Sequence, residues 1–315
     1  MCSASTSTTS SSSAIAPIRP SKWRLRSEAV SFAIAIQGEL GSNSELAVRE
    51  FFSDRVSSPT IVPCRTFDEL FDAVHDGVAD GAMAPLENSL VGSIHEVWRL
   101  LVERPLPVFG ELRLRITHCL IGLPGTELGQ IRHVRSHPQA LAQCERFLHE
   151  LADVEVEAVY DTAGAVQMLA KSGGPHDAAI ASAQAAIDHH MHIIARDLSE
   201  GENFTRFLLL GDVAADQTGD CRKTTLVLQM ADSAAGMAAV LTHLQNHDLQ
   251  VLKVETHKRP GVPWSFDVYL EVAGTTSETE TRAAIEGLHT FSAACHLIGS
   301  YPMGQDIEPR IQTRS

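Results

Sequence analysis

The chain has 315 residues, enough for about two compact domains, and its 44% hydrophobic and 20% charged residues are typical of a globular protein. Its 25 basic and 39 acidic residues give a formal net charge of 25 − 39 = −14. This balance argues against a nucleic-acid binder or an anionic-membrane binder, because both need a basic surface. An anionic small molecule would have to be bound by local hydrogen-bond donors.

Cysteine usage and the N-terminal residues bear on location. The six cysteines are scattered without Cys-x-x-Cys spacing, which predicts reduced thiols and a cytoplasmic protein. No apolar run approaches the roughly 18 residues that span a bilayer. Residues 1–28, rich in serine and threonine, are expected to form a disordered tail without the apolar core of a secretory signal. Their composition also resembles a transit peptide, so a plastid location stays open.

From Ser31 onward, short apolar runs alternate with segments of helical period. The pattern predicts strands at 32–36, 61–64, 81–86, 131–135, 154–159 and 178–181, and helices at 45–52, 67–74, 93–102, 139–151, 163–170 and 184–189. Repeated strand-then-helix units indicate parallel sheets with helices on their faces, and therefore an α/β domain over residues 29–212. Ligands of such sheets bind at the carboxyl ends of the strands.

The turns at those strand ends are rich in small hydroxyl and amide side chains. They are Gly38–Ser44, Pro85–Ser93, Ser136–Gln139 with Gln143 one helical turn further, and Asp161–Ala163. Such residues commonly cap helices, which is the simplest interpretation of each turn alone. Four turns with the same chemistry also suit a site that binds carboxylates through neutral donors.

A second domain follows a polar linker at residues 213–222. Strands at 225–230, 249–254, 264–272 and near Leu297, with helices at 234–244 and 278–288, predict a βαββαβ order over residues 223–304. This is the ferredoxin-like α+β plan. Half-exposed sheets of this kind tend to pair, which predicts a homodimer or homotetramer. Residues 305–315 are expected to form a tail.

Several motifs carry a resemblance to a known family. A polar turn runs into an apolar strand through Thr205-Arg206-Phe207. Together with Glu87-Asn88-Ser89 and Gly92-Ser93, Ser136-His137-Pro138-Gln139 and Asp161-Thr162-Ala163, in this order, it makes residues 31–304 resemble the prephenate dehydratase family. The resemblance implies a two-lobed α/β catalytic domain, similar to type II periplasmic-binding lobes, followed by an ACT domain. It also implies the decarboxylating dehydration of prephenate to phenylpyruvate in L-phenylalanine biosynthesis, without a cofactor.

The resemblance also implies roles for individual residues. Thr205 is the catalytic residue, which donates a hydrogen bond to the departing hydroxyl. Arg206 binds either a substrate carboxylate or a structural one such as Glu87, and Phe207 packs beneath the site or lines it. His137 precedes Pro138, which favours a turn role over catalysis. The substrate-binding residues are Asn88, Ser89, Ser93, Ser136, Gln143, Thr162, Arg206 and Phe207.

The regulatory motifs of the family are altered in this chain. Family members bind phenylalanine through a Gly-Ala-Leu turn and a Glu-Ser-Arg-Pro segment. Here Ala235-Gly236-Met237 and Glu255-Thr256-His257-Lys258 stand at these places, and the glycine is shifted by one position. Because glycine supplies backbone freedom at such a contact, L-phenylalanine as an effector stays open.

The sequence also allows other interpretations. Arogenate dehydratase is the nearest enzymatic alternative, and a non-enzymatic small-molecule sensor or an assembly protein are alternatives of another class. The His189-His190-x-His192 cluster lacks a carboxylate or cysteine at ligand spacing, so no metal is expected. No glycine-rich nucleotide motif is present in the sequence.

Overall fold

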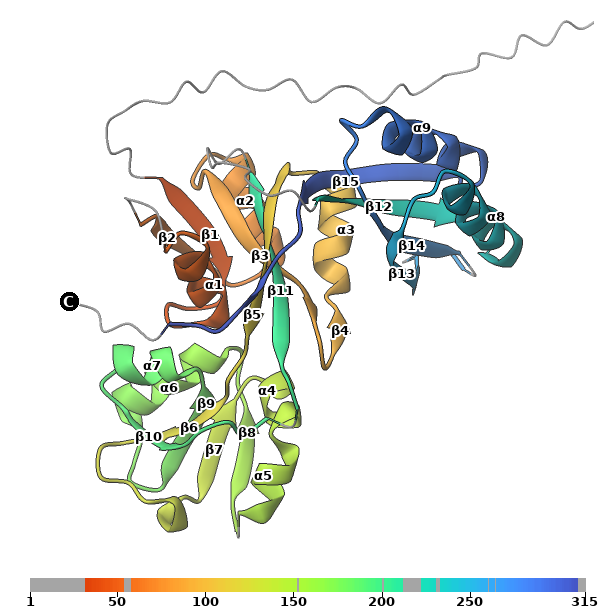
Figure 1. Cartoon of the computed structure of the whole chain (residues 1–315). Coiled ribbons are helices and arrows are strands. Elements are labelled where there is room, and N and C mark those ends of the chain that lie inside the picture. The colour runs from red at the N-terminus through yellow and green to blue at the C-terminus, as the bar shows by residue number, and fades with distance from the viewer. Residues whose placement is uncertain are drawn as a thin grey trace, which may run out of the picture. The chain divides into compact units, whose positions relative to one another are not determined.

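The computed structural model describes residues 32–310 except 54–57, 152, 200, 212–221, 231–232, 260 and 264. These residues belong to one compact unit, Ser31–Ser315, and form three sheets with their covering helices (Figure 1). The expected tail at 1–28 and the expected linker at 213–222, except Arg222, lie outside the described residues.

The first sheet has the strand order β16-β5-β11-β3-β1-β2, with β4 beside β3. As the strand–helix–strand pattern predicts, β1 pairs in parallel with β2 and β3. In contrast, β11 lies antiparallel between β3 and β5. The strands are β1 Ala33–Gln37, β2 Thr60–Cys64, β3 Gly81–Asn88, β4 Gly92–Ser93, β5 Val108–Arg115, β11 Phe204–Gly211 and β16 Asp306–Ile307.

Helices cover both faces of this sheet. Leu46 and Val48 of α1 pack in one apolar cluster with Ile34 and Ile36. Residues of α2 and α3 form the opposite cluster, in which Trp98 is fully buried. Ile34 and Ala35, which are neighbours in β1, fall in different clusters because side chains alternate along a strand. The helices are α1 Asn43–Phe51, α2 Phe67–His75 and α3 His95–Glu103.

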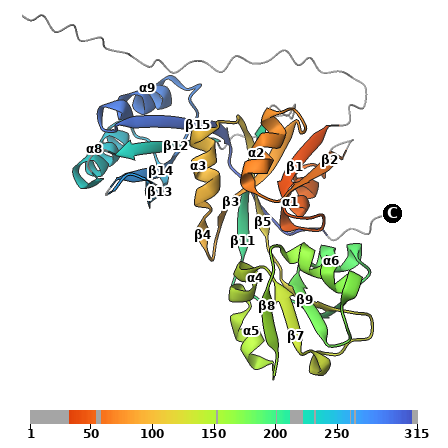
Figure 2. The ribbon, with the colours of Figure 1, turned by 180° about the vertical axis from the view of Figure 1, so that it is seen from behind.

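The second sheet has the order β10-β6-β9-β7-β8. α4 and α5 lie on one side of it and α6 and α7 on the other (Figure 2). The predicted helix at 139–151 is divided into two at Cys144. The elements are β6 Cys119–Gly122, a 3-10 turn at Leu128–Gln130, β7 His133–Ser136, α4 Pro138–Gln143, α5 Glu145–Glu150, β8 Glu155–Ala158, α6 Thr162–Ser172, β9 Asp177–Ala181, α7 Ala183–Asp188 and β10 His192–Ala195.

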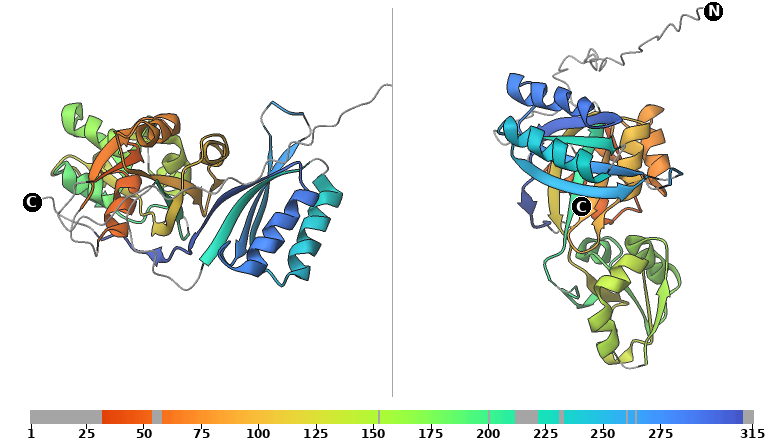
Figure 3. Two further views of the ribbon diagram at one scale, coloured as in Figure 1. Left: turned by 90° about the horizontal axis from the view of Figure 1, so that it is seen from above. Right: turned by 90° about the vertical axis from the view of Figure 1, so that its right-hand side faces the viewer.

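The third sheet confirms the predicted βαββαβ order, with strands arranged β13-β14-β12-β15. Figure 3 shows α8 and α9 on the same face of these strands, where Leu226 and Leu270 join their apolar cluster. Val227 and Tyr269 face the other way and belong to the cluster of α2 and α3. Trp264, the expected start of the third strand, lies outside the described residues. The elements are β12 Arg222–Met230, α8 Ser233–Asn246, β13 Val251–Lys258, β14 Phe266–Ala273, α9 Thr279–Gly287, a 3-10 turn at Leu288–Thr290 and β15 Ala294–Pro302.

The expectation of a tail from residue 305 is corrected by β16. Asp306 and Ile307 pair in parallel with Arg113 and Leu114 of β5. The Arg113 guanidinium also lies 2.8 Å from an oxygen of Asp306. Across the described part of the chain, the structure contains no helix of the length and apolarity that crossing a membrane requires.

Candidate functional site

The candidate site begins where the end of β3 pairs with the start of β11. Asn88 and Thr205 stand opposite each other in this antiparallel pairing. The Asn88 side-chain nitrogen donates to Thr205 Oγ1 at 3.0 Å and to Asn203 Oδ1 at 2.7 Å. Its side-chain oxygen accepts from the backbone N–H groups of Leu90 at 3.0 Å and Val91 at 3.2 Å. Asn88 is buried and Thr205 is half-buried, so the threonine hydroxyl is held in a fixed place without being sealed off.

Gln143 of α4 completes this hydrogen-bond network from the second sheet. Its Nε2 donates to Asn88 Oδ1 at 3.3 Å, and its Oε1 accepts from Asn203 Nδ2 at 3.0 Å. The same oxygen is hydrogen-bonded to His118 Nε2 at 2.7 Å. Asn203 and His118 lie just before β11 and β6, and the sequence interpretation missed both. Nothing in their residue type distinguishes them from ordinary turn residues.

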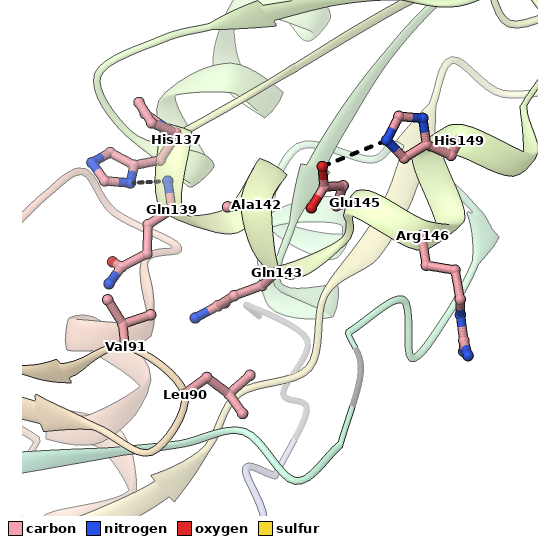
Figure 4. Close-up of a pocket in the computed structure, with 10 residues that line it drawn as sticks. Leu90, Val91, His137, Gln139, Ala142, Gln143, Glu145, Arg146 and His149 are labelled. Atoms are coloured by element: carbon pink, nitrogen blue, oxygen red, sulfur yellow. Dashed lines mark hydrogen bonds and ion pairs between the residues drawn. The ribbon is translucent and has the colours of Figure 1, made fainter.

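A pocket of about 1050 Å³ adjoins this network (Figure 4). Leu90 and Val91, from the turn between β3 and β4, face the side of α4 that carries Gln139 and Gln143. Gln143 belongs to both the pocket wall and the network, whereas Thr205 is linked to it through Asn88. The lining residues are Leu90, Val91, His137, Pro138, Gln139, Ala142, Gln143, Glu145, Arg146 and His149.

His137 and Asp161 serve as helix caps beside this pocket. His137 Nδ1 accepts from the backbone N–H of Gln139 at 3.2 Å, which needs an unprotonated nitrogen. Burial lowers the pKa of His137, and the nearby Asp161 only partly opposes it. Burial also raises the pKa of Asp161, whose carboxylate caps α6 through Gly164 N–H. Thr162 follows half-buried as the first residue of α6. His137 therefore has the turn role that its position before proline favours.

Of the predicted substrate-binding residues, Gln143 lines this pocket, and two others, Ser136 and Phe207, are withdrawn into the interior. Ser136 is fully buried, and its hydroxyl donates to the carbonyl of Ile180 at 2.6 Å. Phe207 is 1% exposed and packs between the first sheet and α1. This position agrees with the interpretation that Phe207 packs beneath the site. Ser89 lies at the surface, where its hydroxyl donates to the carbonyl of Glu202 and accepts from Phe204 N–H. It therefore fixes the chain that leads into β11.

Arg206 is occupied by protein carboxylates. Its guanidinium lies 2.8 Å from Glu87, 3.3 Å from Glu111 and 2.5 Å from Glu271. Burial alone would lower the pKa of Arg206, but the three carboxylates outweigh burial and raise it. Because neighbours in a strand face opposite sides, Arg206 points away from the side on which Thr205 lies. The geometry corrects the substrate-carboxylate assignment and favours the structural one.

Ser93 is also engaged elsewhere. Its hydroxyl donates to Glu255 at 2.6 Å and accepts from Lys253 at 3.1 Å, both on β13. Ser93 is thus bonded to the strand that carries the predicted regulatory glutamate, and not to the pocket. Ala235, Gly236 and Met237 lie in the first turn of α8. A Cβ on Gly236 would come within 2.6 Å of the Met230 side chain, so the helix packs closely at this glycine.

The residues that the structure describes contain no group of three or more His, Cys, Asp or Glu side chains arranged to bind a metal ion. The network instead offers neutral amide and hydroxyl groups. Such groups position a small polar substrate and stabilise charge through hydrogen bonds. The fold and site therefore define an α/β protein with a polar small-molecule pocket followed by a ferredoxin-like region.

Comparison with known proteins identifies the family. Residues 34–215 match the family described as prephenate dehydratase, and the chain belongs to this family of lyases. A bifunctional chorismate mutase/prephenate dehydratase of Enterobacter agglomerans is 32% identical over 85% of this chain and 70% of its own length. An arogenate dehydratase/prephenate dehydratase of Arabidopsis thaliana is 34% identical over 86% and 72%, respectively. The resemblance inferred from the motifs is confirmed.

Solved structures agree on the fold. A prephenate dehydratase of Arthrobacter aurescens in complex with L-Phe superimposes with a TM-score of 0.74 at 26% identity, covering 86% of this chain and 89% of that chain. GqqA, described as a novel type of quorum quenching acylase, also gives a TM-score of 0.74, at 32% identity, covering 86% and 98%. The α/β class and the family's overall architecture are confirmed.

Proposed function

We propose that the chain converts prephenate to phenylpyruvate and that the Thr205 hydroxyl assists the departure of the ring hydroxyl. One observation carries this proposal. Thr205 Oγ1 accepts a hydrogen bond from Asn88 Nδ2 at 3.0 Å, so its own hydrogen is available for another acceptor. Thr205 as a residue is half-buried, so its side chain can offer that hydrogen to a substrate.

The reaction needs positioning and help for one leaving group. As the carbon–carbon bond to the ring carboxylate breaks, carbon dioxide leaves and the electron pair enters the ring. The carbon–oxygen bond then breaks, and the hydroxide takes up a proton to leave as water. Aromatisation supplies the driving force. A threonine hydroxyl is too weak an acid to lose its proton at neutral pH, so Thr205 acts by hydrogen bonding while the proton comes from solvent or a neighbouring group.

The pocket residues supply the rest of the binding. Asn88 is saturated by its five hydrogen bonds, so it positions Thr205 and does not bind substrate directly. Gln143 Nε2 has a second N–H that no residue of the network uses, and Gln143 lines the pocket. Leu90 and Val91 offer apolar surface for the ring.

Kinetics on prephenate test this proposal, with phenylpyruvate followed by its absorbance. Thr205→Ser keeps the hydroxyl and is expected to stay within about fivefold of wild type, whereas Thr205→Ala should lose at least ~10²-fold in kcat. An undiminished Thr205→Ala enzyme removes Thr205 from the mechanism. Rates on arogenate, the substrate in which an amino acid replaces the keto acid, decide the alternative. A higher kcat/KM on arogenate overturns the choice of prephenate.

A second candidate function is the cleavage of an acyl amide. It is favoured by the 32% identity to GqqA over 98% of that chain and by the apolar surface of Leu90 and Val91, which suits an acyl chain. Release of free amine from an N-acyl amino acid derivative would support it. Absence of release at enzyme concentrations that turn over prephenate would exclude it.

We also propose that residues 223–304 form an ACT domain that binds L-phenylalanine. The Arthrobacter aurescens relative, which is in complex with L-Phe, supports this proposal. Glu255 is already bonded by Ser93 and Lys253, so phenylalanine has to compete with these contacts for it. Isothermal titration at millimolar phenylalanine tests it, and an absence of heat would show that the site is lost or retuned.

Assembly and location belong to the same proposal. We expect a homodimer or homotetramer because Leu241, Val254 and Leu297 of the ferredoxin-like region are each more than a third exposed. Light scattering after size exclusion would show a monomer if this is incorrect. We expect a cytoplasmic protein, and a fluorescent fusion of residues 1–28 that enters plastids would establish the alternative.

A further inference from the structure

His118 is a buried histidine for which neither the motifs nor the pocket assigns a role. It is 3% exposed, it stands immediately before β6, and its backbone carbonyl accepts from Leu198 N–H at 3.1 Å. Its Nε2 lies 2.7 Å from Gln143 Oε1. Its Nδ1 is buried and has no hydrogen-bond partner among the residues that the structure describes. The tautomer of His118 therefore depends on which atom of Gln143, the oxygen or the nitrogen, faces Nε2.

The turn after β3 fixes the orientation of Asn88. The backbone N–H groups of Leu90 and Val91 can only donate, so the Asn88 atom that faces both of them is the amide oxygen. Asn88 Nδ2 therefore faces Thr205 and Asn203. An amide flip at this position would place two donors against two donors.

The orientation of the Asn88 amide determines that of the Gln143 amide, and through it the tautomer of His118. Because Asn88 Oδ1 accepts, the Gln143 atom that faces it is the nitrogen, at 3.3 Å. Gln143 Oε1 then faces Asn203 Nδ2 and His118 Nε2. That oxygen can only accept, so His118 Nε2 carries a hydrogen. The neutral form then leaves Nδ1 unprotonated, in agreement with its lack of a partner.

We propose that His118, as the neutral Nε2–H tautomer, is a positioning residue that holds Gln143 Oε1 and thereby keeps Gln143 Nε2 on Asn88 Oδ1, in the network that leaves the Thr205 hydrogen free for the substrate. The proposal rests on the proposed function and deepens it. Burial lowers the pKa of His118, and the bond to Gln143 opposes this only in part, which agrees with a neutral ring near pH 7. His118 itself does not line the pocket.

Two substitutions separate positioning from simple packing. His118→Leu fills much of the space without a donor, and it is expected to lower kcat on prephenate by about 10- to 100-fold with KM within about threefold. His118→Gln can extend an N–H to the place of Nε2, and it should be at least about tenfold faster than the leucine variant. A leucine variant with wild-type kcat, or a glutamine variant as slow as leucine, overturns the proposal.

A spectroscopic readout decides the tautomer without activity. In protein labelled with ¹⁵N-histidine, the signal missing from His118→Gln belongs to His118. Protonated Nε2 with unprotonated Nδ1 supports the proposal, and the opposite tautomer overturns it even if the leucine variant fails to fold. A wild-type protein inactive on prephenate removes the proposed function and the catalytic part of this inference. Protonation at Nδ1 in an active enzyme removes the positioning role alone.

Discussion

Arg206 offers the sharpest test of how the first and third sheets are held together. Replacing Arg206 by Met keeps a side chain of similar reach and removes the charge from a cluster that includes Glu87, Glu111 and Glu271. Breaking a buried ion pair by removing one partner typically costs 3–5 kcal/mol, because a charge is left without compensation in the interior.

The remaining cations set the expected size of the effect. Lys223 stays within 2.5 Å of Glu111 and 3.0 Å of Glu271, and Lys253 stays 2.7 Å from Glu87. Each carboxylate therefore keeps one positive neighbour, and the loss should fall at the lower end of the range, about 3 kcal/mol. This corresponds to roughly a hundredfold change in the unfolding equilibrium.

Urea unfolding followed by tryptophan fluorescence measures this loss. Arg113→Met provides the matched control, because its ion pair with Asp306 is exposed and should be worth less than about 1 kcal/mol. The KM of folded Arg206→Met for substrate should stay within about threefold of wild type. A variant of unchanged stability with a strongly raised KM would refute the structural role and restore Arg206 as a substrate-binding residue.

Three further predictions concern the pH dependence, the core and the site. Burial by itself raises the pKa of Glu271, but Arg206 and Lys223 outweigh burial and lower it. The unfolded chain therefore takes up the proton first, and the stabilisation is present above about pH 4.5 and lost as the pH falls further. Urea midpoints at pH 7 and pH 4 should differ less in Glu271→Gln than in wild type, and equal differences contradict the linkage. Phe207→Ala should lose about 3–5 kcal/mol of unfolding free energy because the ring is buried against α1, and a loss below 1 kcal/mol would place the ring elsewhere. Asn203→Ala removes two hydrogen bonds of the network and should lower kcat by about 10- to 100-fold, and an unchanged kcat would show that Asn88 and Gln143 hold without it.

The local pattern of apolar and polar residues predicts many of the strands and helices. The apolar runs of β1 and β9 and the helical period of α2 and α6 can be recognised from neighbouring residues alone. They arise because each strand or helix buries apolar side chains on the core. The βαββαβ order of residues 222–302 was also readable, since each strand and helix has its own period. Asn88, Gln143 and Thr205, which the motifs predict to share a site, lie in one hydrogen-bond network, although Gln143 comes from α4 on the second sheet and the other two from the first sheet.

The local pattern does not predict which strands pair with each other or in which direction. β11 lies antiparallel between β3 and β5, in a sheet that the pattern predicts to be parallel, because the chain leaves the first sheet along β5 and returns along β11. The sequence predicts a tail at β16 because two residues are too few to show a period, and it is the pairing with β5 that defines this strand. The division of the 139–151 helix at Cys144 was likewise invisible in its apolar spacing.

The sequence by itself determined most of the strands and helices and indicated which turns carry polar side chains, because side-chain type and periodicity are properties of the local chain. Only the tertiary structure decided which of those side chains still have a free hydrogen-bonding group. It assigned Arg206 and Ser93 to contacts with the third sheet, it withdrew Ser136 and Phe207 into the interior, and it added His118 and Asn203 to the site. The physical reason is that a donor or acceptor forms its hydrogen bond with whichever partner folding brings within about 3 Å. That partner can be more than 100 residues away in the chain, as Thr205 is from Asn88.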